Sequence, residues 1–204
     1  MPKRRKSLPH PLTEEESKKL LAVTSSRSIT ALRDQVAILL MLRAGLRVSE
    51  TCNLAPSDLD MGARKLRVHR GKGAKDRVLY LAPHVADRLA VWLARRPNGS
   101  RWLLPVIHGG RRALGEATPG GRMSPRSVAA HLSRLAQDAG IERKVSPHEL
   151  RHTYATRELT RGVNITQIQR ALGHGDLSTT AIYLHVVDSD REASANGMPT
   201  DVLP

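Results

Sequence analysis

Basic and imidazole side chains occur in this sequence at expected helix starts and turns, where a phosphate group could be held. His148 and Arg151 are three residues apart on one expected helix, so their side chains point the same way. Arg47 stands at the start of another helix, and Lys72 lies in the glycine-punctuated turn of residues 71–76. Together these side chains suit the binding and activation of a phosphodiester.

Tyr183 lies on the next expected helix and carries a phenol that could attack a phosphodiester. In the transition state negative charge accumulates on the phosphate oxygens, and the planar forks of Arg47 and Arg151 match that geometry as an electrostatic clamp. The phenol of a tyrosine has a reference pKa of about 10, and surrounding cations favour its ionised form. A covalent phosphotyrosine conserves the bond energy, so rejoining the strand needs no ATP.

Five pieces of the sequence resemble, in the same order, those of the tyrosine recombinases, also called phage-type integrases. They are AGLRVSE (44–50), RGKGAKDR (70–77), HELRHTYAT (148–156), ALGHGDLSTT (171–180) and AIYLHV (181–186). The resemblance covers roughly residues 13 to 187 and implies attack by Tyr183 to give a 3′-phosphotyrosine and a free 5′-hydroxyl. Taken singly, each residue has an ordinary structural explanation; the ordered constellation favours catalysis.

The same resemblance assigns roles to the remaining candidates. It makes Lys72 the general acid for the leaving 5′-oxygen, with Lys75 as a competitor for that role. It implies that His148 accepts the tyrosine proton or donates to a phosphate oxygen, and that His174 is a second phosphate donor. Glu50, one helical turn after the first clamp arginine, could orient that arginine or a histidine.

The formal net charge of +14 favours a polyanionic partner, and double-stranded DNA is the partner that the resemblance implies. A solubilising basic surface is the alternative reading of the same charge. Besides the catalytic residues, the candidate DNA-binding residues are Lys3, Arg4, Arg5, Lys6, Lys75, Arg77, Arg126 and Arg134. The resemblance also implies a homo-oligomer, a tetramer on two DNA duplexes during the reaction, formed from a protein that could be monomeric when free.

The periodicity predicts a mainly α-helical protein with one small antiparallel β-sheet (α+β), which is the fold class of the family's catalytic domain. We expect a flexible basic arm over residues 1–12, a catalytic domain over 13–187 and a polar tail over 188–204. The expected helices cover 13–23, 33–44, 47–54, 83–95, 124–139, 146–161, 164–172 and a last segment ending at Tyr183. The sheet is expected within 58–81, and residues 97–123 are expected to be irregular.

Most relatives carry an additional N-terminal helical domain, and Arg47 comes too early in this chain to leave room for one. The chain is therefore expected to be a fragment or a short family member that consists of the catalytic domain alone. It has a single cysteine, Cys52, and lacks a membrane-spanning apolar run, so the expected location is cytoplasmic without a membrane partner.

Residues 148–152 also satisfy the H-E-x-x-H pattern of zinc proteases, in which His148 and His152 would bind Zn²⁺ and Glu149 would be the general base. Arg151 would repel the metal, and the pattern leaves the other candidates unexplained, so we expect neither metal nor cofactor. The full phosphate-binding pattern of nucleotide-binding loops is absent from the GKGAKD turn. A type IB topoisomerase and a DNA-binding regulator with an idle site remain the alternative functions.

Overall fold

The computed structural model describes residues 10–24, 28–69, 76–107 and 117–173. It divides the chain into two compact units, residues 1–154 and 155–204. The helices that lie wholly in the first unit are α1 (Glu14–Val23), α2 (Ile29–Ala44), α3 (Val48–Asn53), α4 (Pro83–Arg95) and α5 (Pro125–Asp138), with a short 3-10 helix η1 (Pro56–Asp58). Helix α6 (Pro147–Thr160) runs through the boundary, and α7 (Ile165–Leu172) belongs to the second unit.

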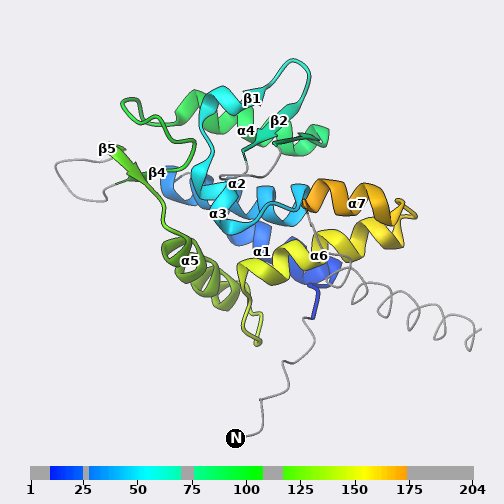
Figure 1. Cartoon of the computed structure of the whole chain (residues 1–204). Helices are drawn as coiled ribbons and strands as arrows, with labels where there is room; N and C mark the ends of the chain where they lie inside the picture. The colour runs from blue at the N-terminus through cyan, green and yellow to red at the C-terminus, as the bar shows by residue number, and fades with distance from the viewer. Residues whose placement is uncertain (1–9, 25–27, 70–75, 108–116, 174–204) are drawn as a thin grey trace, which may run out of the picture. The chain divides into compact units, whose positions relative to one another are not determined.

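Helix α2 is the centre of the first unit. Its residues from Leu32 to Leu42 are all buried; the apolar sequence predicts this from Val36 to Leu42, and polar Arg33 to Gln35 are buried in addition. It packs against α3, α4 and α5, and Figure 1 shows it between α4 and α5. The helix begins at Ile29 rather than at Arg33, and it ends at Gly45, whose φ of 69° is the left-handed conformation that glycine adopts readily.

The other predicted helix boundaries agree closely with the structure. The capping box of α1 is present, because the Thr13 hydroxyl accepts from the Glu16 backbone while the Glu16 carboxylate accepts from the Thr13 backbone. Ser124 caps α5 through the Ser127 N–H. In the second unit, Asn164 caps α7 as predicted. The predicted helix that ends at Tyr183 lies outside the described residues.

The described residues form two small antiparallel sheets instead of the one expected. The first has the order β1 (Leu59–Asp60), β2 (Lys65–Val68), β3 (Arg77–Tyr80), and its register pairs Val68 with Arg77. The second pairs β4 (Pro105–Ile107) with β5 (Ala117–Arg122).

The expectation that residues 97–123 are irregular is therefore wrong for these two strands. Their sequences contain proline and glycine, which normally argue against a strand. Each strand of a two-stranded sheet is an edge strand, however, and an edge strand tolerates a proline that donates no hydrogen bond.

The end of the predicted basic arm is packed rather than free. Leu12 is 5% exposed, and its N–H donates to the Thr153 hydroxyl on α6 at 2.8 Å. Arg143 donates to the carbonyls of His10 and Pro11. Residues 1–9 lie outside the described residues. Within the described ranges, none of the helices combines the length and apolar character needed to cross a membrane.

Candidate active site

Arg47 is positioned by the sharp start of α3. The chain leaves α2 through Gly45 and fully buried Leu46, and Arg47 then stands in extended conformation at the N-cap of α3. Its backbone N–H donates to Glu50 Oε2 at 2.8 Å, and its Nη1 donates to Glu50 Oε1 at 3.1 Å. The Arg47 side chain is 41% exposed. Glu50 thus holds Arg47 through both its backbone N–H and its guanidinium, while part of the side chain faces solvent.

Arg151 reaches the same carboxylate from α6. Its Nη1 donates to the Gly45 carbonyl at 2.7 Å and lies 3.7 Å from Glu50 Oε2. The side chain is 4% exposed. Gly45, which ends α2 just before Arg47, therefore also binds Arg151 through its carbonyl. The two predicted clamp arginines meet at Glu50 although they are far apart in the sequence.

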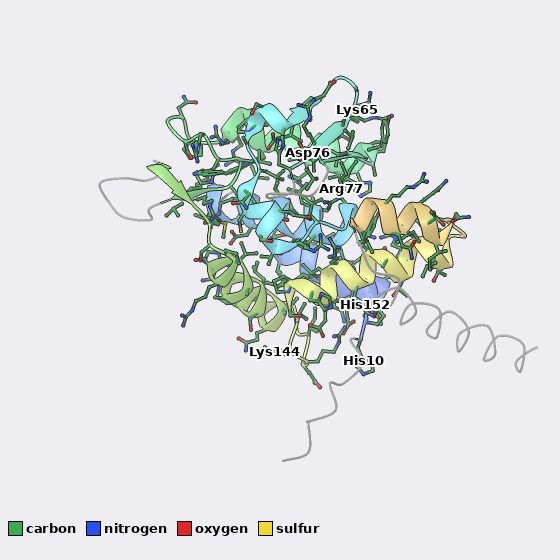
Figure 2. All side chains as sticks on the ribbon, in the orientation of Figure 1. His10, Lys65, Asp76, Arg77, Lys144 and His152 are labelled. Carbon is green, nitrogen blue, oxygen red and sulfur yellow. The ribbon has the colours of Figure 1, made fainter. Side chains whose placement is uncertain are left out.

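Arg77 is the third guanidinium at this carboxylate. It lies at the start of β3, next to Asp76 (Figure 2). Its Nη1 and Nη2 donate to Glu50 Oε1 and Oε2, each at 2.8 Å, which is the bidentate geometry of a strong ion pair. Its side chain is 9% exposed. The structure thus places this predicted DNA-binding residue against an internal carboxylate.

Glu50 is held in its ionised form by these arginines. Burial raises the pKa of its carboxyl, but hydrogen bonds from Arg77 and from the Arg47 backbone, with the charges of Arg77 and Arg151, outweigh burial and lower the pKa to about 2. Three guanidinium groups meet at this one carboxylate, so positive charge exceeds negative charge within this group of four side chains. A surplus of this kind, with one arginine partly exposed, suits the binding of an anion.

The remaining predicted residues have more varied positions. His148 is exposed at the first turn of α6, and Arg126 and Arg134 are exposed on α5. The structure therefore brings Arg47, Glu50 and Arg151 together, with Arg77 added. The predicted residues that lie outside the described ranges are Lys3, Arg4, Arg5, Lys6, Lys72, Lys75, His174 and Tyr183.

Sequence reasoning missed the partnership between Arg77 and Glu50. A signal for it exists in β3, whose side chains alternate between the two faces of the sheet. Val78 and Tyr80 are 51% and 74% exposed, whereas Leu79 is buried. Arg77 shares the face of Leu79, so an inward arginine that needs a buried acid could have been inferred from the strand register.

The zinc-protease pattern does not form a metal site within the described residues. Its first histidine, His148, is exposed, whereas His152, labelled in Figure 2, is 1% exposed. Across the described ranges, no group of three or more His, Cys, Asp or Glu side chains is arranged to hold a metal ion.

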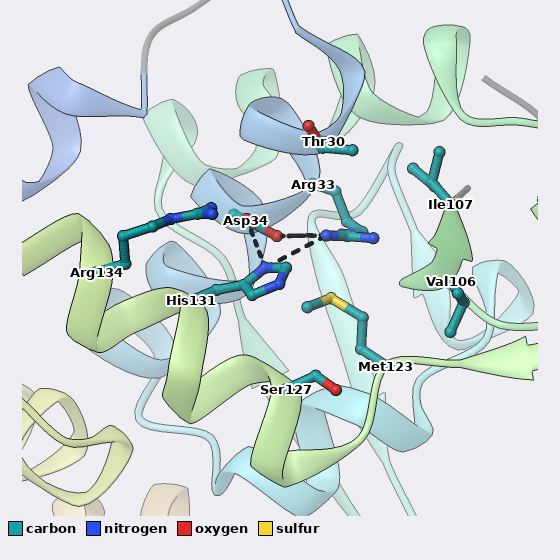
Figure 3. A pocket seen from close by; sticks show the side chains of 9 residues that line it. All are labelled: Thr30, Arg33, Asp34, Val106, Ile107, Met123, Ser127, His131 and Arg134. Atoms are coloured by element: carbon teal, nitrogen blue, oxygen red, sulfur yellow. Dashed lines mark hydrogen bonds and ion pairs between the residues drawn. The ribbon is translucent and has the colours of Figure 1, made fainter. Parts of the chain in front are cut away.

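A second cluster of charges lines a pocket of about 320 Å³ between the start of α2, β4 and α5 (Figure 3). Asp34 Oδ1 accepts from Arg33 Nε at 3.1 Å and from Arg33 Nη2 at 2.9 Å, while Asp34 Oδ2 lies 2.9 Å from His131 Nδ1. Arg33 Nη1 also donates to the Pro105 carbonyl. This cluster joins α2, β4 and α5 inside the first unit.

Residues 10–190 match the phage integrase family, and the chain belongs to that family. The tyrosine recombinase XerA of Thermococcus kodakarensis is 44% identical over 91% of this chain and 61% of its own length. The tyrosine recombinase XerC of Myxococcus xanthus is 38% identical over 91% of this chain and 61% of its own length. The chain thus spans about three fifths of the length of these relatives.

Solved structures show the same fold. A crystal structure of XerA recombinase matches 97% of this chain and 67% of that chain, with a TM-score of 0.74 and 34% identity. The site-specific recombinase XerH, bound to a palindromic difH substrate in a post-cleavage complex, matches 94% of this chain and 54% of that chain, with a TM-score of 0.71 and 26% identity. The predicted fold class, mainly helical with small antiparallel sheets, is confirmed.

Proposed function

We propose that this chain cleaves and rejoins DNA as a site-specific recombinase through a covalent 3′-phosphotyrosine intermediate. The observation that carries the proposal is the convergence of Arg47 and Arg151 on the largely buried carboxylate of Glu50, in a member of the phage integrase family. A pair of fixed arginines with surplus positive charge stabilises the charge that develops on phosphate oxygens in the transition state. The recombinase names of the relatives support the same activity.

In the proposed reaction, the phenol oxygen of Tyr183 attacks phosphorus, and the bond between phosphorus and the 5′-oxygen breaks. The tyrosine proton passes to a base, for which His148 is the candidate, and Lys72 donates a proton to the departing 5′-oxygen. Arg47, Arg151 and His174 bind the nonbridging oxygens. Rejoining is the reverse step, in which a 5′-hydroxyl attacks the phosphotyrosine and releases the phenol. The proposed reaction therefore consumes no nucleotide and uses no metal.

Double-stranded DNA is the proposed partner, because the chain carries a net charge of +14 and the related XerH was solved with a DNA substrate. Arg126 and Arg134, exposed on α5, are proposed to contact the duplex, together with the lysines and arginines of residues 3–6 and Lys75. Assembly into a tetramer on two duplexes and a cytoplasmic location are further parts of this proposal.

The test is covalent trapping on a nicked suicide substrate, in which the cleaved strand loses a short fragment and cannot be rejoined. Tyr183→Phe is expected to abolish the covalent adduct while the dissociation constant for the uncleaved duplex stays within about threefold, because only the nucleophilic oxygen is removed. Tyr80→Phe is the matched control, since Tyr80 is 74% exposed on β3 and has no proposed role. Mapping the adduct to its residue completes the measurement.

An adduct that persists in Tyr183→Phe, or that maps to another residue, contradicts the proposal. Absence of any adduct in the unmodified chain, with DNA binding intact, would favour a DNA-binding regulator. Relaxation of supercoiled DNA without partner sites would instead indicate topoisomerase activity.

A further inference from the structure

We propose that Arg77 is a positioning residue, which acts through Glu50 to hold Arg47 and Arg151 in place for the phosphate. This inference rests on the proposed function, because it assigns Arg77 a part in the same reaction. It differs from the expectation that Arg77 binds DNA directly. It depends only on contacts between described residues of the first unit.

The first argument is geometric. Arg77 donates to both oxygens of Glu50 at 2.8 Å, and a fork of this kind sets the plane of the carboxylate. In that plane Oε1 also accepts from Arg47 Nη1, while Oε2 accepts from the Arg47 N–H and faces Arg151 Nη1. The direction in which Glu50 presents its remaining lone pairs is therefore determined from β3.

The second argument is electrostatic. The Glu50 side chain is 10% exposed, so water cannot replace a missing partner fully. Without Arg77, the negative charge of Glu50 would be balanced by Arg47 and Arg151 alone. Both guanidinium groups would then be drawn closer to Glu50. With Arg77 in place, its bidentate guanidinium neutralises the acid, and Glu50 therefore attracts Arg47 and Arg151 less strongly.

The third argument concerns access. Arg77 lies on the inward face of β3, and its side chain is 9% exposed, whereas Arg47 is 41% exposed. An arginine that contacts DNA phosphates directly needs its guanidinium at the surface. The same sheet offers such a residue for comparison: Arg67 on β2 is exposed and lies opposite Val78 in the register.

Arg77→Ala and Arg67→Ala form a matched pair, because each removes one positive charge from the same sheet. We expect Arg77→Ala to slow adduct formation on the suicide substrate by about 10- to 100-fold at saturating protein, as a displaced catalytic group does. Its dissociation constant for DNA should change by less than about threefold, and Arg67→Ala should change the cleavage rate by less than about threefold. If Arg77→Ala raises the dissociation constant for DNA but leaves the rate of adduct formation at saturating protein unchanged, the proposal is overturned.

A double-mutant cycle asks whether Arg77 acts through Glu50. Glu50→Gln alone should slow cleavage, and the double variant Arg77→Ala/Glu50→Gln should be no slower than about the worse single variant, because both changes remove one shared interaction. Multiplication of the two single effects would mean that Arg77 acts independently of Glu50 and would overturn the inference.

A modified substrate distinguishes the clamp from the leaving-group acid. When the 5′-bridging oxygen is replaced by sulfur, the leaving thiolate needs no proton, because a thiol is a far stronger acid than an alcohol. The defect of Lys72→Ala should then be relieved, whereas Arg77→Ala should remain slow, like Arg47→Ala. If the sulfur substrate restored the cleavage rate of Arg77→Ala, Arg77 would serve proton donation to the leaving group. That result would reject its assignment as a positioning residue.

Thermal unfolding followed by circular dichroism shows whether Arg77→Ala folds. If it does not fold, Arg77→Lys is the variant that tests the proposal. Lysine retains the charge but cannot donate in a fork, so positioning predicts a slowed reaction. A rate equal to that of the unmodified chain would contradict positioning. If Tyr183→Phe still forms the adduct, the proposed function itself fails, and that outcome is separate from any result with Arg77.

Discussion

Two carboxylates in the first unit, buried Asp34 and largely buried Glu50, each pair with arginine, but their surroundings differ. Asp34 pairs with one guanidinium, Arg33, which is 4% exposed and which also donates to a backbone carbonyl of β4. Glu50 has three guanidinium groups around it, one of which is 41% exposed. The same types of side chain therefore build two different environments.

The difference shows how structural and functional charges can be told apart. At Asp34 the acid and its arginine balance each other inside the protein, and His131 extends the cluster to α5, so the cluster joins elements. At Glu50 three guanidinium groups meet one carboxylate, so positive charge exceeds negative charge within this group of four side chains. An internal ion pair with surplus charge and partial exposure is the feature that marks the candidate active site.

The largest effect on stability is expected at the balanced pair. Arg33→Ala leaves Asp34 buried without its guanidinium, and breaking one side of a buried ion pair costs about 3–5 kcal/mol. Urea denaturation should show the free energy of unfolding lowered by this amount, while the folded fraction retains its cleavage rate within about threefold. A loss below about 1 kcal/mol would mean that His131 or solvent satisfies Asp34 on its own.

Arg47→Ala is expected to have the opposite profile. It should reduce the rate of adduct formation by about a hundred- to a thousandfold, the range for losing a preorganised donor at a transition state. The thermal unfolding midpoint should change little, because the arginine is partly exposed. Equal cleavage rates in Arg47→Ala and the unmodified chain would remove the distinction between the two clusters.

The pH dependence of stability sharpens the comparison further. The folded pKa of Glu50 is lowered to about 2 from an ordinary value of 4.5, chiefly because the Arg77 and Arg47 hydrogen bonds outweigh burial, which raises it. Its contribution is therefore fully present above the unfolded pKa and is lost as the pH falls from about 4.5 toward 2. Between about pH 5 and pH 3, the unmodified chain should lose about 2 kcal/mol more than Glu50→Gln does. Parallel stability curves for the two proteins would contradict the ion pairing.

Much of the fold was predictable because local signals agreed with the packing. The start of α1 follows from Thr13 and Glu16, and the end of α2 follows from Gly45. The pairing of β4 with β5 was not predicted, because the β5 sequence ATPGGR contains proline and glycine and lacks the alternating apolar pattern of a strand. The contact between Arg151 and the Gly45 carbonyl was equally invisible, because a carbonyl is present at every position.

What the sequence by itself determined was the set of chemically competent residues and their order, because spacing on a helix and family motifs are properties of the chain alone. It identified Arg47, Glu50 and Arg151 as belonging together. Only the tertiary structure decided that Arg77 shares the carboxylate of Glu50. The physical reason is that the charge left over for a ligand depends on which cations each buried acid binds, and that pairing arises only when α3, β3 and α6 pack together.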